Sequence, residues 1–121
     1  MIGIGVDVVE IERFRRSLER TPSMRERIFT GVELDYVAAH ADPVPSLAVR
    51  FAAREAVMKS LGLGLGAFGF HDVWIERAET GQPSLAVAGR AAELANDAGV
   101  TRWHVSLTHS DLVAVAYVVA E

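Results

Sequence analysis

The spacing of apolar residues predicts a strand followed by an amphipathic helix at the start of the chain. Residues 2–8 run through small and branched apolar side chains, as a buried-type strand does. Over residues 9–20, Ile11, Phe14 and Leu18 recur at helical spacing, so these three side chains are expected to face the core. A Thr-Pro-Ser sequence then breaks the pattern, and one or two short helices are expected before residue 40.

A long apolar helix is predicted in the middle of the chain. It is expected to begin near Ser46, a residue type that caps helix N-termini, and to run to Leu61. Apolar side chains surround it on nearly every side, which is typical of a buried helix. A loop with four glycines follows over residues 62–70, and its backbone can approach a ligand closely because glycine has no side chain.

The C-terminal half is predicted to contain a hairpin, a helix and a second hairpin. The strands are expected over residues 73–78 and 84–88, and again over 102–109 and 112–120, each pair joined by a turn-forming segment. The helix between the hairpins covers residues 90–98 and stops before a glycine. This order predicts an α+β fold with a mostly antiparallel sheet and a long central helix.

Composition narrows the class of protein. The 121 residues suit one domain, residues 1–121, and 50% of them are hydrophobic, so part of the apolar surface is expected to face a partner subunit. There is no cysteine, which excludes disulfide frameworks and zinc–thiolate sites. The net charge of −4 argues against nucleic-acid binding by bulk charge. Neither a signal-peptide pattern nor a bilayer-length apolar run is present, so a cytoplasmic protein without membrane contact is expected.

Basic residues are concentrated near the N-terminus. Six of the 12 lysines and arginines lie between residues 13 and 27, beginning with Arg13. Such density in an acidic chain can mark a docking face for an acidic partner. Glutamates are interleaved with these arginines, so a solvated helix face is the alternative interpretation.

Two carboxylates and a lysine stand in apolar surroundings. Glu55 and Lys59 lie at i,i+4 on the buried-type helix, and Asp7 ends the apolar first strand. Both carboxylates could have a purely structural role. Glu55 can pair with Lys59 or Arg54, and Asp7 can stabilise the N-terminus of the next helix. Buried charges must nevertheless be paired or bound to an ion, and two carboxylates with substrate phosphates are the usual way to hold magnesium. A magnesium-assisted phosphate site is therefore the favoured hypothesis.

A third segment, Trp103–His109, has two different faces. Strand alternation puts Trp103, Val105 and Leu107 on one face, which is expected to be the core. His104, Ser106 and Thr108 then share the other face, where they can donate hydrogen bonds to a phosphate or simply face solvent. The four histidines lack the spacing of a metal site.

Three segments resemble motifs of the holo-acyl-carrier-protein synthases, the small bacterial class of 4′-phosphopantetheinyl transferases. They are Gly3–Arg13, Arg50–Gly62 and His104–His109, in the family's order and at its separations. The similarity covers essentially the whole chain, and the second segment is the specific one. Position 54 departs from the pattern, because arginine stands where lysine is common in the family.

The resemblance implies a 4′-phosphopantetheinyl transferase fold and a magnesium-dependent reaction. Coenzyme A gives its phosphopantetheine arm to a serine of an apo acyl carrier protein, as in fatty acid biosynthesis, and 3′,5′-ADP leaves. A homotrimer with sites between subunits is also implied. The family's site residues carry over as follows: Asp7 and Glu55 as magnesium ligands, Glu55 and Lys59 as catalytic residues, Arg50, Gly62, Gly64, Gly66, His104 and Thr108 as coenzyme A contacts, and Arg13 as the docking residue for the carrier.

Elementary chemistry agrees with these roles. Magnesium neutralises diphosphate charge, Lys59 stabilises the leaving phosphate, and either Glu55 or a metal-bound water takes the serine proton. On a helical wheel Arg50 lies about 140° from Glu55, so both serve phosphates if Arg50 points into a neighbouring subunit's site. The alternatives are a non-catalytic trimeric domain that binds an acidic partner, and another magnesium-dependent nucleotide enzyme, which the absence of a P-loop disfavours.

Overall fold

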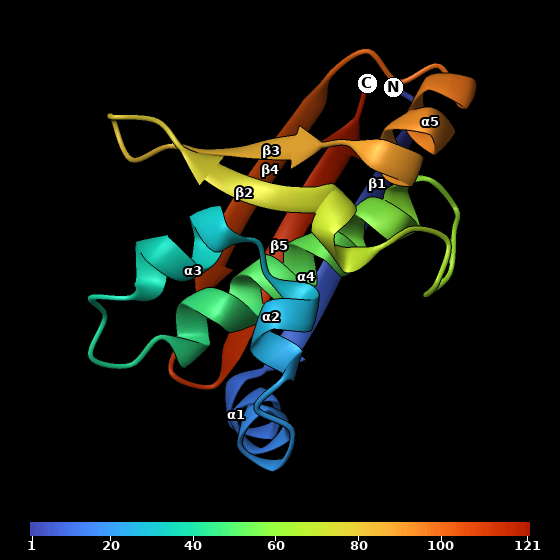
Figure 1. Ribbon diagram of the computed structural model, residues 1–121. Helices are drawn as coiled ribbons and strands as arrows, with labels where there is room; N and C mark the ends of the chain where they lie inside the picture. Colours follow the sequence, from blue (N-terminus) through green and yellow to red (C-terminus); the bar gives the residue numbers. More distant parts are fainter.

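A computed structural model describes residues 1–121 and has the expected α+β fold (Figure 1). In chain order the elements are β1 (Gly3–Glu10), α1 (Ile11–Arg20), α2 (Met24–Ile28), α3 (Gly31–Val37), α4 (Val44–Ser60), the 3₁₀ helix η1 (Phe70–Asp72), β2 (Val73–Arg77), β3 (Pro83–Val87), α5 (Gly89–Asp97), β4 (Trp103–His109) and β5 (Val113–Ala120). Both predicted hairpins and the predicted order of elements are confirmed. None of the helices has the length and apolar character that a membrane span requires.

Two antiparallel sheets frame the long helix. The larger has the strand order β1-β5-β4, and the smaller is the β2-β3 hairpin. The first and last strands of the chain are neighbours, with Gly3 opposite Ala120, so the two termini lie close together (Figure 1). Helix α4 lies across one face of the larger sheet and contacts β1 and β5. The prediction of a mostly antiparallel sheet with a central helix is therefore confirmed.

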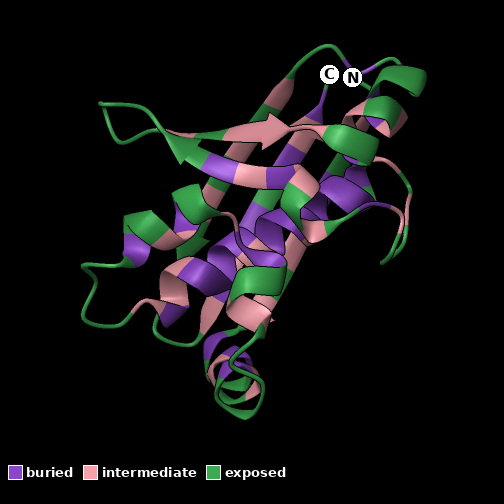
Figure 2. Ribbon diagram, viewed as in Figure 1, coloured by how far each residue is buried: buried purple, intermediate pink, exposed green.

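Helix α4 forms the centre of the core, as its all-round apolar pattern predicts (Figure 2). Small side chains such as Ala52 and Ala56 are fully buried against the sheet. Strand β1 comes even closer, because a Cβ added to Gly3 or Gly5 would lie 1.8 Å from the carbonyl oxygen of Ser60 or Ala56. No side chain fits there, so the two glycines let the β1 backbone rest directly on α4.

Two element boundaries differ from the sequence-based expectation. Helix α4 begins at Val44, so Ser46 lies within the first turn and does not cap the helix. The Ser46 hydroxyl instead accepts a hydrogen bond from Arg50 Nη1 at 2.6 Å. Pro45 is tolerated in the first turn, where a backbone N–H has no helical partner to lose. The second difference is in β1, which continues to Glu10 because Glu10 still pairs with Val113 of β5. Helix α1 therefore starts at Ile11.

A buried ion pair ties α3 and β2 to α4. Arg54 donates to both carboxylate oxygens of Glu33, at 2.5 and 2.9 Å, and both side chains are completely buried. Glu33 also accepts hydrogen bonds from the backbone N–H groups of Thr30 and Ile75, and Arg54 Nε donates to the Phe70 carbonyl. A guanidinium matches this planar two-point contact and an ammonium does not, which accounts for an arginine at position 54.

Candidate functional site

Asp7 and Lys59 meet where β1 crosses α4. Strand alternation puts Asp7 on the same face as Gly3 and Gly5, which is the face toward the helix. Lys59 Nζ donates to Asp7 Oδ1 at 2.9 Å and to the Val6 carbonyl oxygen at 3.1 Å. Asp7 is thus a mid-strand residue, and the expectation that it ends the strand was wrong because β1 runs three residues further. The alternative role as a helix N-terminal carboxylate does not apply.

Glu55 belongs to the same group but makes no ion pair. Burial raises the pKa of the Glu55 carboxyl, the nearby Asp7 charge raises this pKa further, and Lys59 lowers it. Neither alternative partner is used, because Lys59 bonds Asp7 and Arg54 bonds Glu33. Glu55 is therefore a half-buried carboxylate with a like charge nearby and no cation in contact.

These two carboxylates fit a hard divalent cation. An ion bound to both Asp7 and Glu55 would remove their mutual repulsion and give Glu55 the positive partner that it lacks. No group of three or more His, Cys, Asp or Glu side chains suited to a metal gathers anywhere in the chain. Magnesium commonly binds through one or two carboxylates together with water and substrate phosphates, so the pair is a sufficient protein contribution.

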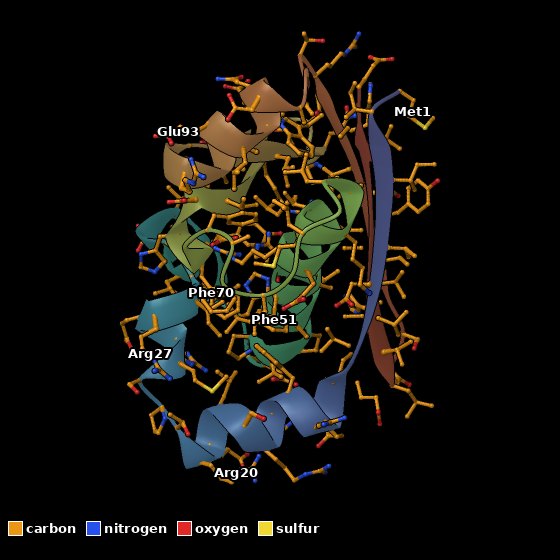
Figure 3. All side chains as sticks on the ribbon, turned by 90° about the vertical axis from the view of Figure 1, so that its right-hand side faces the viewer. Met1, Arg20, Arg27, Phe51, Phe70 and Glu93 are labelled. Carbon is orange, nitrogen blue, oxygen red and sulfur yellow. The ribbon has the colours of Figure 1, made fainter.

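A pocket of about 370 Å³ opens beside the carboxylates, and a second of about 590 Å³ adjoins it. The first pocket is lined by Asp7, Glu55 and Arg13 and has Phe51 in its wall. The second shares Glu55 and Phe51 and is largely apolar. Figure 3 shows Phe51 of α4 close to Phe70 of η1. Their ring centres are 6.1 Å apart. No sequence pattern points to these aromatic walls, because an apolar side chain on a buried helix looks like any core residue.

The glycine-rich loop reaches this region through one side chain. Leu65 lines the larger apolar pocket with Glu55, although it is 71% exposed. Neither this pocket nor the carboxylate pocket is lined by Gly62, Gly64 or Gly66, and Gly62 and Gly66 adopt φ angles of 70° and 91°. Glycine is favoured at these two positions for its backbone freedom. The contact of these three glycines with a cofactor stays a prediction.

Arg50 lies in a different pocket from Glu55. This pocket, of about 270 Å³, is also lined by Thr108, so the structure brings together two of the predicted cofactor contacts. It shares no residue with the carboxylate pocket, in agreement with the wide angle between Arg50 and Glu55 around α4. Tyr36 and Arg77 also line this pocket, and neither was predicted as a site residue. No motif covers Tyr36, and only the folding of β2 brings Arg77 to this place.

His104 stands apart from both groups. It is exposed on β4, on the face opposite Trp103, Val105 and Leu107, as strand alternation predicts. Its Nε2 lies 3.2 Å from Glu121 Oε1, and this contact lowers the pKa of the Glu121 carboxyl. Within one chain, therefore, the predicted cofactor contacts do not form a single site.

Arg13 reaches outward from α1. Its side chain is exposed and lines the carboxylate pocket, whereas Ile11, Phe14 and Leu18 of the same helix are buried. The predicted core face of the helix is thus confirmed, and Arg13 is a free cation at the rim of the pocket that holds Asp7.

The Glu55→Gln variant is expected to be at least as stable as the wild type in metal-free solution at neutral pH. A carboxyl whose pKa is raised by folding binds its proton more tightly in the folded protein, so stability falls as pH rises from about 4 through the raised pKa. Glutamine does not ionise, so the Glu55→Gln variant does not lose stability in this way. Thermal unfolding in a chelating buffer at several pH values measures the stability of both proteins, with the exposed Glu19→Gln as control. A glutamine variant less stable than the wild type at neutral pH would show that Glu55 serves the fold.

The chain is similar to known proteins over nearly its whole length. Residues 3–118 match the family model described as the 4′-phosphopantetheinyl transferase superfamily. The holo-[acyl-carrier-protein] synthase of Streptomyces griseus is 48% identical over 122 residues, covering 100% of this chain and 98% of the relative. The corresponding synthase of Micrococcus luteus is 46% identical over 123 residues, covering 100% of this chain and 92% of the relative.

Solved structures give the same result. A crystal structure of the holo-[acyl-carrier-protein] synthase from Neisseria meningitidis superposes with a TM-score of 0.90 at 32% identity, over 100% of this chain and 98% of that one. The synthase from Bacillus anthracis, solved in complex with CoA (3′,5′-ADP), has a TM-score of 0.82 at 30% identity, over 98% of this chain and 95% of that one.

Proposed function

The chain belongs to the 4′-phosphopantetheinyl transferase superfamily, and we propose that it transfers 4′-phosphopantetheine from coenzyme A to a serine of an apo acyl carrier protein. The observation that carries this proposal is the meeting of Asp7, Glu55 and Lys59 at the crossing of β1 and α4. Two carboxylates can hold a metal ion that neutralises a diphosphate, and a lysine beside them can stabilise the charge that develops on the leaving phosphate.

The reaction exchanges one phosphorus–oxygen bond for another. The serine oxygen bonds to the phosphorus that carries the pantetheine arm, the diphosphate bridge breaks, and 3′,5′-ADP leaves with the bridging oxygen. Magnesium held by Asp7 and Glu55 would neutralise the diphosphate and make its phosphorus more electrophilic. Lys59 Nζ, oriented by Asp7 and the Val6 carbonyl, keeps a donor for the leaving phosphate. Glu55 can take the serine proton, and a water held on the magnesium would be the alternative acceptor.

The decisive experiment is modification of a carrier protein. Incubation of the purified chain with magnesium, coenzyme A and an apo carrier should raise the mass of the carrier by one phosphopantetheine group. A carrier with its acceptor serine replaced by alanine is the control, and omission of magnesium should stop the reaction. A complex with the carrier but no mass gain would instead support the non-catalytic alternative.

We also propose a homotrimer with each site shared between neighbouring subunits. The face of the larger sheet turned away from α4 exposes an aliphatic row on β1 together with Tyr117 of β5: Ile4, Val6, Val8 and Tyr117 are each more than two-fifths exposed. Sheets that face water normally carry polar residues there. Cover from other subunits would bury this row, and it would allow the Arg50 pocket of one chain to complete the carboxylate site of the next.

Ile4→Glu is expected to yield monomers with little activity. A charge in the aliphatic row opposes burial of the sheet face, and the side chain is 47% exposed within one chain, so the fold itself should persist. Light scattering and the carrier assay measure both effects. Val32→Glu, at an exposed apolar position on α3, is the matched control. A wild-type chain that is fully active as a monomer would refute both the trimer and the shared site.

Arg13→Glu is expected to raise KM for the carrier strongly and to leave KM for coenzyme A nearly unchanged. Complementary charge speeds the encounter with an acidic carrier and fixes its orientation, and Arg13 lies at the rim of the carboxylate pocket. Steady-state kinetics with each substrate varied in turn measures this, with Arg90→Glu on α5 as control. Equal increases in KM for both substrates would indicate a damaged site and would contradict a docking role for Arg13.

A further inference from the structure

The C-terminal end of α2 is held by a histidine side chain from a distant segment. His71 of η1 places its Nε2 atom 2.6 Å from the backbone carbonyl oxygen of Glu26, 45 residues earlier in the chain. A carbonyl oxygen only accepts hydrogen bonds, so Nε2 is the donor. None of the three segments that resemble family motifs contains His71, and the proposed reaction does not use it.

This bond fills a gap in the backbone pairing of α2. The N–H group four residues after Glu26 belongs to Thr30, and it donates to the Glu33 carboxylate at 3.0 Å. The N–H group of Phe29 bonds the carbonyl oxygen that precedes that of Glu26. The Glu26 carbonyl oxygen is therefore one of the acceptors that a helix end leaves free, and His71 satisfies it.

Helix α2 depends on such contacts for its position. It has five residues, Met24–Ile28, too few for a helix that is stable by itself. Ile28 is its one buried residue, and η1 is the element that it packs against most. The bond from His71 is the only hydrogen bond between α2 and a side chain. Loss of this bond should therefore let α2 move relative to the rest of the fold.

The 3₁₀ helix η1 is itself fixed to two other helices. The Phe70 carbonyl oxygen accepts from Arg54 Nε of α4 at 2.8 Å, and Arg54 belongs to the buried ion pair. On the other side of His71, Asp72 Oδ2 accepts from the Ala91 backbone N–H of α5 at 3.2 Å. A histidine between two such anchors is a fixed support, so it can set the distance between α2 and α4.

The position of α2 shapes the pockets beside the carboxylates. Met24, Arg27 and Ile28 line the larger apolar pocket together with Glu55. Met24 also lines the carboxylate pocket, whose rim carries Arg13, and Arg27 is exposed on α2 (Figure 3). A movement of α2 would therefore change the wall next to Glu55 on the side where the carrier is proposed to dock.

We propose that His71 is a positioning residue of the transfer reaction, whose Nε2–H group holds α2 in place as one wall of the carrier site. This inference rests on the proposed function, with Arg13 of the neighbouring helix as the docking residue. His71 lines neither pocket beside the carboxylates, so it acts through α2. Its effect should therefore appear in the binding of the carrier, and not in the binding of coenzyme A or in the chemical step.

His71→Leu should raise KM for the carrier about 3–10-fold, the effect of losing one hydrogen bond, with kcat and KM for coenzyme A retained. Two amide variants separate the bond from polarity in general. The side-chain nitrogen in His71→Gln reaches about as far as Nε2 and should restore the wild-type KM, whereas that in His71→Asn reaches only as far as Nδ1 and should not. If the two amide variants have the same KM for the carrier, the proposal is overturned.

Asp72→Ala is the matched control for a general loss of stability. It removes a bond from the same 3₁₀ helix, but that bond leads to α5 and not to α2. This variant should lower the free energy of unfolding at least as much as His71→Leu and leave KM for the carrier unchanged. An equal rise of this KM in Asp72→Ala would give His71 only a structural role and would overturn the proposal.

A measurement on the free protein separates this inference from the proposed reaction. The chain has three methionines, of which only Met24 lines the two pockets, so the methyl signal of Met24 in a methionine-labelled NMR spectrum reports the position of α2. His71→Leu should shift this signal, His71→Gln should restore it, and the buried Met58 should not respond. If no carrier is modified but Met24 responds in this way, the reaction fails and the positioning role stands. If carriers are modified and the Met24 signal is the same in His71→Leu as in the wild type, the positioning role alone fails.

Discussion

Lys59→Ala should lower kcat about 10²–10³-fold and leave KM for coenzyme A within a few-fold of the wild-type value. The charge of Lys59 matters most when negative charge develops on the leaving phosphate, and an interaction made mainly in the transition state appears in kcat. The side chain is 53% exposed and its removal opens no cavity, so the variant should fold normally. Steady-state kinetics and thermal unfolding measure the two expectations.

The composition of the chain allows a sharper version of this experiment. Lys59 is the only lysine, since the other eleven basic residues are arginines. Lys59→Arg keeps the charge but removes a group able to give up a proton at neutral pH. If Lys59→Arg has activity close to the wild type, the reaction needs only a positive charge at position 59. A large loss of activity would show that the reaction needs either a proton from Lys59 or its compact ammonium group.

An amine-selective reagent should label only Lys59 and the N-terminus, so protection of Lys59 by coenzyme A with magnesium can be followed by mass spectrometry. An unchanged kcat with a raised KM in Lys59→Ala would make Lys59 a binding residue.

Glu33→Ala should destabilise the fold by about 3–5 kcal/mol, because it leaves the Arg54 charge buried without a counter-ion. Glu33 also accepts the backbone N–H groups of Thr30 and Ile75, so α3 and β2 lose a common anchor. Denaturant unfolding at fixed protein concentration measures the effect.

The Arg15–Asp42 pair provides the matched control for Glu33. It has the same two-point geometry, at 2.9 and 2.8 Å, but lies at the surface. Asp42→Ala should therefore cost several times less than Glu33→Ala, since water replaces the lost partner. A double variant with methionine at positions 33 and 54 should recover part of the loss, because the buried charge is removed together with its partner. Similar costs for Glu33→Ala and Asp42→Ala would contradict a stabilising role of the buried pair.

The sequence alone determined the elements and their faces. Helical spacing identified Ile11, Phe14 and Leu18 as core residues, and alternation put His104 and Thr108 on the outer face of β4. These predictions succeeded because the repeat of a helix or strand directly encodes which side chains are buried. The charged residues of the long apolar helix pointed to the candidate site, because a charge in apolar surroundings is costly without a partner. The expectation that Lys59 is buried was wrong, since its side chain lies at the surface and is 53% exposed.

Only the tertiary structure decided which charges meet. Lys59 bonds Asp7, 52 residues away, and not Glu55, although the helical spacing offered that pair. Arg54 bonds Glu33 across 21 residues, and Arg50 shares the ring of Tyr36 with Arg77. Such contacts depend on how closely whole elements pack, and local periodicity carries no information on that distance.

The crossing of β1 and α4 shows the physical reason most directly. A Cβ at Gly5 would lie 1.8 Å from the Ala56 carbonyl oxygen, so the absence of one side chain sets the spacing between strand and helix. That spacing brings Asp7 within reach of Lys59 and lets its charge act on Glu55. The sequence specified the glycine and the carboxylates, and the packing of one backbone on another turned them into a site.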